Sequence, residues 1–117
     1  MKLDEYQNKA QTTFLRDNVY KSLGGHPLSS VIYLGLKLSG EAGEVGEKIG
    51  KLLRDKDGRL STEDRQELIK ELGDVLWYTA VLTDELDVSL EHVAQTNLNK
   101  LASRKERGVI GGSGDNR

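Results

Sequence analysis

The sequence contains no cysteine, which excludes disulfide bonds, thiol catalysis and thiolate metal ligands. No run of eighteen apolar residues occurs, so no membrane-spanning helix is predicted. Residues 1–6 are largely polar and lack the apolar stretch of a signal peptide. These absences suit a reducing compartment, and we expect a cytoplasmic protein.

The sequence also lacks a large excess of charge of either sign. The 117 residues include 17 basic and 19 acidic side chains, which gives a net charge of −2. Such a balance argues against a nucleic-acid polymer or a membrane surface as a general partner. A chain of this length forms one domain that can bury a core without disulfides or a structural metal.

Strand signals are absent too, because nothing alternates with period two over a strand length and no Asn-Gly pair occurs. Helical periodicity predicts an all-α, four-helix bundle-like fold with helices over about 3–19, 28–54, 61–86 and 89–107. Ser61 with Asp64 resembles a capping box, and Ser89 is the expected N-cap of the last helix. We expect one domain over 1–117: a helical core, 1–107, and a tail, 108–117, whose four glycines in ten residues favour a disordered terminus.

What the sequence does contain is two pairs of carboxylates, Glu41-x-x-Glu44 and Glu71-x-x-Asp74. Residues three apart on a helix project from one face, so two neighbouring helices would aim four carboxylates at one place. The cluster repels itself unless a cation neutralises it, and oxygen ligands favour Mg²⁺ or Mn²⁺. The alternative is that such pairs merely decorate solvated helices. Glu41 lies at the edge of an apolar helical stripe, which favours an inward-facing ligand.

Glycines in the second predicted helix form a second pattern. Gly43, Gly46 and Gly50 fall together, opposite the apolar stripe. Each interior glycine weakens a helix, so the strip indicates close approach of a second backbone. We expect a homo-oligomer, either a dimer or a tetramer; the alternative is that the first helix of the same chain lies across the glycines. Trp77 also lies opposite its helix's apolar stripe, and we expect it at an oligomer contact.

Both carboxylate pairs, the segment Lys70-Glu71-Leu72-Gly73-Asp74-Val75-Leu76-Trp77-Tyr78 and the ending Gly112-Ser113-Gly114-Asp115-Asn116-Arg117 resemble the MazG-like nucleoside triphosphate pyrophosphohydrolases. One departure is Gly40, where many relatives carry another glutamate. The resemblance implies hydrolysis of an NTP or dNTP to the monophosphate and pyrophosphate. It also implies Mg²⁺ held by Glu41, Glu44, Glu71 and Asp74, with Mn²⁺ as a possible substitute.

In that chemistry a water of lowered pKa attacks the α-phosphorus, and we expect Glu44 or Glu47 to take its proton. Cationic side chains on the last helix suit pyrophosphate, although they also suit the helix C-terminal dipole. The glycine tail could wrap phosphates as a substrate-ordered lid. The predicted substrate-binding residues are Asn97, Lys100, Arg104, Lys105, Arg107, Asp115, Asn116 and Arg117.

The motifs exclude one other class of function and leave two open. Di-iron bundles need Glu-x-x-His pairs, but Leu23 precedes His26 by three residues and Ser89 precedes His92. A non-catalytic helical interaction module stays possible, with acidic pairs as decoration. So does a related all-α dUTPase, dCTPase or phosphoribosyl-ATP pyrophosphohydrolase, because the metal ligands do not select the base.

Overall fold

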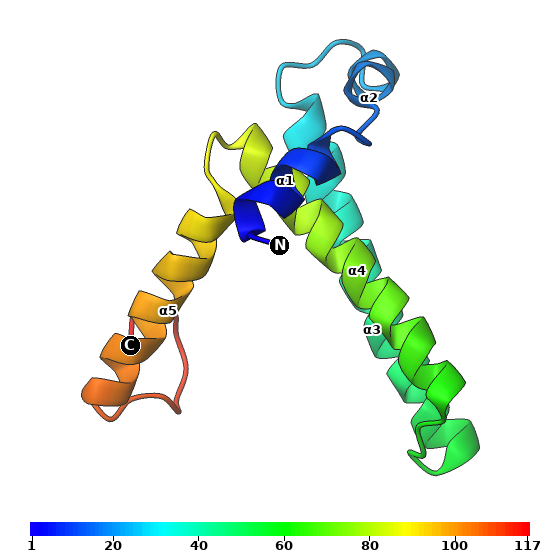
Figure 1. Ribbon diagram of the computed structural model, residues 1–117, viewed down its shortest axis with the longest axis vertical. Coiled ribbons are helices and arrows are strands. Elements are labelled where there is room, and N and C mark those ends of the chain that lie inside the picture. The colour runs from blue at the N-terminus through cyan, green and yellow to red at the C-terminus, as the bar shows by residue number, and fades with distance from the viewer.

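The computed structural model describes all 117 residues and contains only helices and connecting turns (Figure 1). The all-α prediction is confirmed, and the last three helices lie within two residues of their expected bounds. None of the helices combines the length and the apolar composition needed to cross a bilayer. The elements are α1 (Leu3–Gln11), α2 (Arg16–Ser22), α3 (Ser29–Lys56), α4 (Thr62–Glu85) and α5 (Leu90–Glu106).

The single first helix expected over residues 3–19 is wrong, because the chain breaks there into α1 and α2. Two threonine hydroxyls end α1: Thr12 Oγ1 donates to Lys9 O at 2.6 Å and Thr13 Oγ1 donates to Ala10 O at 2.8 Å. Side chains that bond nearby carbonyls in this way compete with the helical ladder. The break turns the chain so that α2 packs on α3 while α1 packs on α4.

Both predicted N-caps are confirmed. Asp64 N donates to Ser61 Oγ at 3.1 Å, and Ser61 N donates to an Asp64 carboxylate oxygen at 3.0 Å. These bonds and the ammonium of Lys56 lower the pKa of Asp64 to about 2. At the next helix, His92 N donates to Ser89 Oγ at 3.0 Å. These local bonds fix where α4 and α5 begin.

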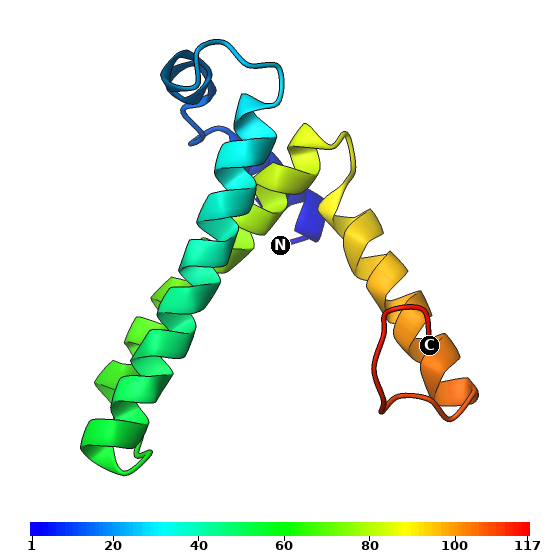
Figure 2. The same cartoon turned by 180° about the vertical axis from the view of Figure 1, so that it is seen from behind.

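The helices do not close into a bundle. α3 and α4 run side by side as one leg, α5 leaves in another direction as a second leg, and α1 crosses where the legs meet (Figures 1 and 2). The radius of gyration is 17.3 Å, whereas a chain of this length folded as a compact domain has about 13 Å. Much surface that a bundle would bury is therefore left uncovered.

The core lies at the junction of the legs and is small: Ala10, Leu34, Ala80, Val81 and Leu90 are its buried apolar residues. Aromatic rings extend it. The ring of Trp77 lies 4.8 Å from that of Tyr78 and 6.2 Å from that of Phe14, and its Nε1 donates to Thr13 Oγ1 at 2.8 Å. Trp77 thus packs against its own chain but stays half-buried, and its place at an oligomer contact stays a prediction.

A buried glutamine joins three elements at the same junction. Gln7 Nε2 donates to Ala80 O, Thr83 Oγ1 and Val88 O at 3.2, 3.1 and 3.0 Å, and Gln7 Oε1 accepts from Leu90 N at 3.0 Å. One side chain of α1 therefore satisfies backbone groups at the end of α4, in the α4–α5 turn and at the start of α5. It helps to set the direction in which α5 leaves.

The glycine strip of α3 is open. No atom outside the helix lies within 4 Å of a methyl group placed at Gly43, Gly46 or Gly50. The intrachain alternative, in which the first helix covers these glycines, is wrong, because α1 packs against α4 and α5.

Candidate metal centre

The structure brings three of the four predicted metal ligands together. Glu41 and Glu44 on α3 and Glu71 on α4 each offer a carboxylate oxygen, and these oxygens all lie within 4.8 Å of one another. The side chains of Glu41 and Glu71 are only 14% and 13% exposed. Glu44 lies on the solvent side. The antiparallel packing of α3 on α4 creates the cluster, as the motif spacing predicts.

Mutual repulsion is the main electrostatic feature of these three residues. The charges of Glu41 and then Glu71 raise the pKa of Glu44 above its usual value. Two lysines offset part of the charge: Lys37 Nζ lies 3.7 Å from Glu41, and Lys48 Nζ lies 2.8 Å from Glu71. A negative charge therefore remains at Glu44. An oxygen-only, net negative site of this kind fits a hard divalent cation.

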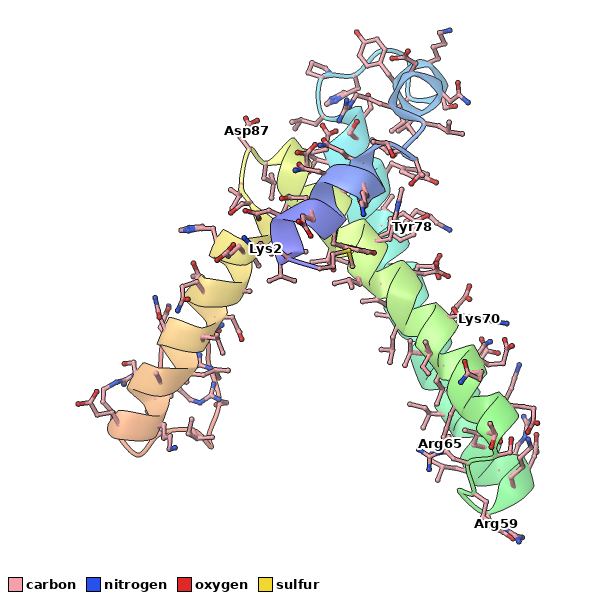
Figure 3. All side chains as sticks on the ribbon, in the orientation of Figure 1. Lys2, Arg59, Arg65, Lys70, Tyr78 and Asp87 are labelled. Carbon is pink, nitrogen blue, oxygen red and sulfur yellow. The ribbon has the colours of Figure 1, made fainter.

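Asp74 lies outside the group of three. It is exposed on α4, and its charge contributes, after burial, to the raised pKa of Tyr6 on α1. It acts similarly on Tyr78, which is labelled in Figure 3 close to the α1 crossing. Asp74 is thus at the end of the cluster nearer to α1, and its role as a fourth ligand stays a prediction.

Two tyrosines, Tyr33 on α3 and Tyr78 on α4, lie beside the carboxylate cluster. Burial, followed by the Tyr33 hydroxyl, raises the pKa of Tyr78 to about 12, and the charge of Glu41 adds to the effect. The ring of Tyr78 lies 6.5 Å from that of Tyr33, and Lys37 Nζ lies 5.9 Å from its centre. Tyr78 is therefore a neutral phenol at neutral pH, and Lys37 lies near both its ring and Glu41.

The structure separates the two predicted general bases. Glu44 lies in the cluster, whereas the Glu47 side chain is 67% exposed and pairs with Lys51 at 3.3 Å on the surface of α3. Of the two, only Glu44 therefore belongs to the carboxylate cluster.

The predicted substrate-binding residues gather on α5 and the tail. Lys100 and Arg104 both contact Asp115, and Arg107 donates to the main-chain oxygen of Arg117. The tail is folded back on α5, unlike the disordered terminus that its composition favours. The remaining three candidates, Asn97, Lys105 and Asn116, are exposed.

The two halves of the predicted site lie on different legs. The carboxylates belong to the α3–α4 leg, whereas the tail and its cations lie along α5, where the C-terminus is marked (Figures 1 and 2). Sequence reasoning missed this separation, because the direction of α5 depends on Gln7 and the junction core.

Comparisons with known proteins support the motif assignment. The model of the MazG nucleotide pyrophosphohydrolase domain matches residues 30–109, which include both carboxylate pairs. The Gene 37 protein of Mycobacterium phage L5 is 50% identical over an alignment of 118 residues that covers all of both chains. The uncharacterized protein YvdC of Bacillus subtilis (strain 168) is 36% identical over 92 residues, which cover 74% of this chain and 86% of that protein. No solved structure matches the chain.

Proposed function

Because this chain belongs to the MazG nucleotide pyrophosphohydrolase family, we propose that it hydrolyses a nucleoside triphosphate, ribo or deoxy, to the monophosphate and pyrophosphate with Mg²⁺. The observation that carries the proposal is the convergence of Glu41, Glu44 and Glu71 to within 4.8 Å, inside the segment that the family model matches. Mn²⁺, which accepts the same oxygen ligands, is the expected substitute.

Glu41, Glu44 and Glu71 would hold the ion, and Asp74, one helical turn from Glu71, would join them. When bound, a divalent cation neutralises phosphate oxygens and lowers the pKa of water. The low exposure of Glu41 and Glu71 orients both carboxylates before a ligand arrives.

Glu44 is the proposed general base. It is the most exposed member of the cluster, so a water molecule can reach it while Glu41 and Glu71 hold the ion from the less exposed side. It would take a proton from the water that attacks the α-phosphorus, and the bond from that phosphorus to the bridging oxygen would break. The departing pyrophosphate needs cations, and Lys100, Arg104 and Arg107 are the residues we propose for that role.

We also propose that the working protein is a homo-oligomer. One chain exposes 8335 Å², whereas a folded monomer of this mass exposes about 6,300 Å². The excess of about 2,000 Å² per chain is what obligate homodimers bury. Large apolar side chains of α3 and α4, including Leu36, Ile69 and Leu72, are among the exposed residues, and the glycine strip is uncovered.

Gly46→Leu is expected to split the oligomer while the helical circular dichroism is retained, because leucine prevents a second backbone from approaching the strip. Sedimentation velocity at micromolar concentration measures the change. Gly111→Leu, a glycine-to-leucine change in the tail with open space around it, is the matched control and should leave the mass unchanged. A wild-type protein that sediments as a monomer contradicts the proposal.

The reaction is tested with a panel of canonical and modified NTPs and dNTPs together with phosphoribosyl-ATP, with Mg²⁺ or with EDTA, scored for monophosphate and pyrophosphate. Release of both products from at least one nucleotide, only with the metal, is the expected result. Strict preference for dUTP or dCTP, or for phosphoribosyl-ATP, would assign the chain to one of those specialised activities. No product from any nucleotide would favour the non-catalytic interaction module.

A further inference from the structure

The tail holds its own anion against two cations of α5. Asp115 Oδ1 lies 2.9 Å from Lys100 Nζ and 3.1 Å from Arg104 Nη2, and the Asp115 carbonyl accepts from the same Arg104 nitrogen. Lys100 and then Arg104 hold the pKa of Asp115 below its usual range. One carboxylate of the chain therefore already pairs with two of the cations proposed to bind phosphate, and a net positive charge remains at the pair.

Arg117 makes the tail a closed loop. Its guanidinium donates to the carbonyls of Val109, Ile110, Gly111 and Gly114 at 2.6–3.2 Å. Because these bonds lie inside the tail, the segment can move as one body once its bonds to Lys100, Arg104 and Arg107 break. Gly108, where the tail leaves α5, has φ +70°, a conformation that glycine adopts without strain and that suits a hinge.

Arg104 is not fully satisfied by this arrangement. Its side chain is only 7% exposed, and its buried Nε has no hydrogen-bond partner. Asp115 uses Nη2 alone. A phosphate could bind Nε and Nη2 side by side, as guanidinium groups commonly bind oxyanions. Since Nε is closed to solvent, a ligand reaches it only after a local movement, and the tail bonds the same guanidinium.

We propose that Asp115 is an internal competitor, which holds the Lys100–Arg104 pair until the polyphosphate of a nucleotide, or pyrophosphate, displaces it and swings the tail about Gly108. The choice of ligand rests on the proposed function. Asp115 thus excludes weaker anions, because a tethered group competes at an effective concentration in the millimolar range. Pyrophosphate overcomes it with more charge and with the Nε contact that a single carboxylate leaves unused.

The test is titration calorimetry with inorganic pyrophosphate in EDTA at fixed ionic strength, so that the carboxylate cluster takes no part. Asp115→Asn is expected to bind pyrophosphate about tenfold more tightly than wild type, because the competing charge is gone. Glu106→Gln is the matched control: it removes the same charge from an exposed residue near the end of α5 and should change affinity less than about twofold. Lys100→Met should weaken binding.

Amide NMR signals of Gly111, Gly112 and Gly114 give a second measurement. Pyrophosphate should move the wild-type signals toward those of ligand-free Asp115→Asn. The proposal is overturned if Asp115→Asn binds pyrophosphate no more tightly than Glu106→Gln does. It is also overturned if pyrophosphate does not shift the amide signals of the tail. Neither measurement depends on turnover. If no nucleotide is hydrolysed, only the proposed function is lost. If nucleotides are hydrolysed but the calorimetry and NMR results are negative, only the proposed role of Asp115 as a competitor is lost.

Discussion

Glu41→Gln is expected to lower Mg²⁺-dependent pyrophosphate release by about 100-fold or more, because it removes a nearly buried ligand from a three-carboxylate site. Glu44→Gln should cause a loss of similar size through the general base. Steady-state turnover across a Mg²⁺ titration measures both, and added metal should not restore the maximal rate of Glu44→Gln.

Two matched substitutions test whether position, rather than charge, decides the loss. Glu47→Gln should retain most of the activity, because that side chain pairs with Lys51 outside the cluster. Glu91→Gln, on the exposed first turn of α5, should behave like wild type. Without metal, Glu41→Gln should melt at a higher temperature than wild type, because the charge that raises the pKa of Glu44 is gone. Turnover retained in Glu41→Gln would eliminate the metal-site model.

Gln7→Leu is expected to lower the free energy of unfolding by about 3 kcal/mol, because it leaves Leu90 N and Val88 O without the hydrogen-bond partner that Gln7 supplies. Equilibrium denaturation at one protein concentration measures the change. The free energy lost with these hydrogen bonds should exceed what the leucine side chain gains by being buried. Gln7 is only 5% exposed, and the groups around its amide are polar.

The control for this substitution is Gln95→Leu. Gln95 is exposed on α5 and donates only to Asn99, so its replacement should change stability by less than about 0.5 kcal/mol. Equal midpoints for the two variants would mean that the junction does not depend on Gln7.

The helices from α3 onward could be predicted because their signals are local. Apolar periodicity and the caps at Ser61 and Ser89 lie within a few residues of what they determine. The break after α1 also has a local cause, but Thr12 and Thr13 bond carbonyls that a helix would use, and periodicity alone does not reveal this. No local sequence pattern indicates the role of Gln7, because its hydrogen-bond partners lie 73–83 residues away in the chain.

The residues of the candidate site also fall into those that local spacing predicts and those that depend on distant contacts. Glu41, Glu44 and Glu71 could be grouped from their spacing, since α3 and α4 are neighbours in the chain and pack along their length. The same spacing also places Asp74 with them, but in the structure Asp74 is exposed and lies outside the group of three. The folded tail could not be foreseen: its composition suggests disorder, and the Arg117 bonds that order it exist only once the loop is closed.

If the proposed oligomer forms, the two diverging legs make the amount of active protein depend on its own concentration. A chain with five buried apolar residues has little cohesion alone, so much of the stability of the proposed oligomer comes from association, which depends on concentration. The yield of active sites should then rise more steeply than the rate of synthesis. Newly made chains are then expected to be more open to proteolysis before they associate, and halving the supply of chain should lower the proposed activity by more than half.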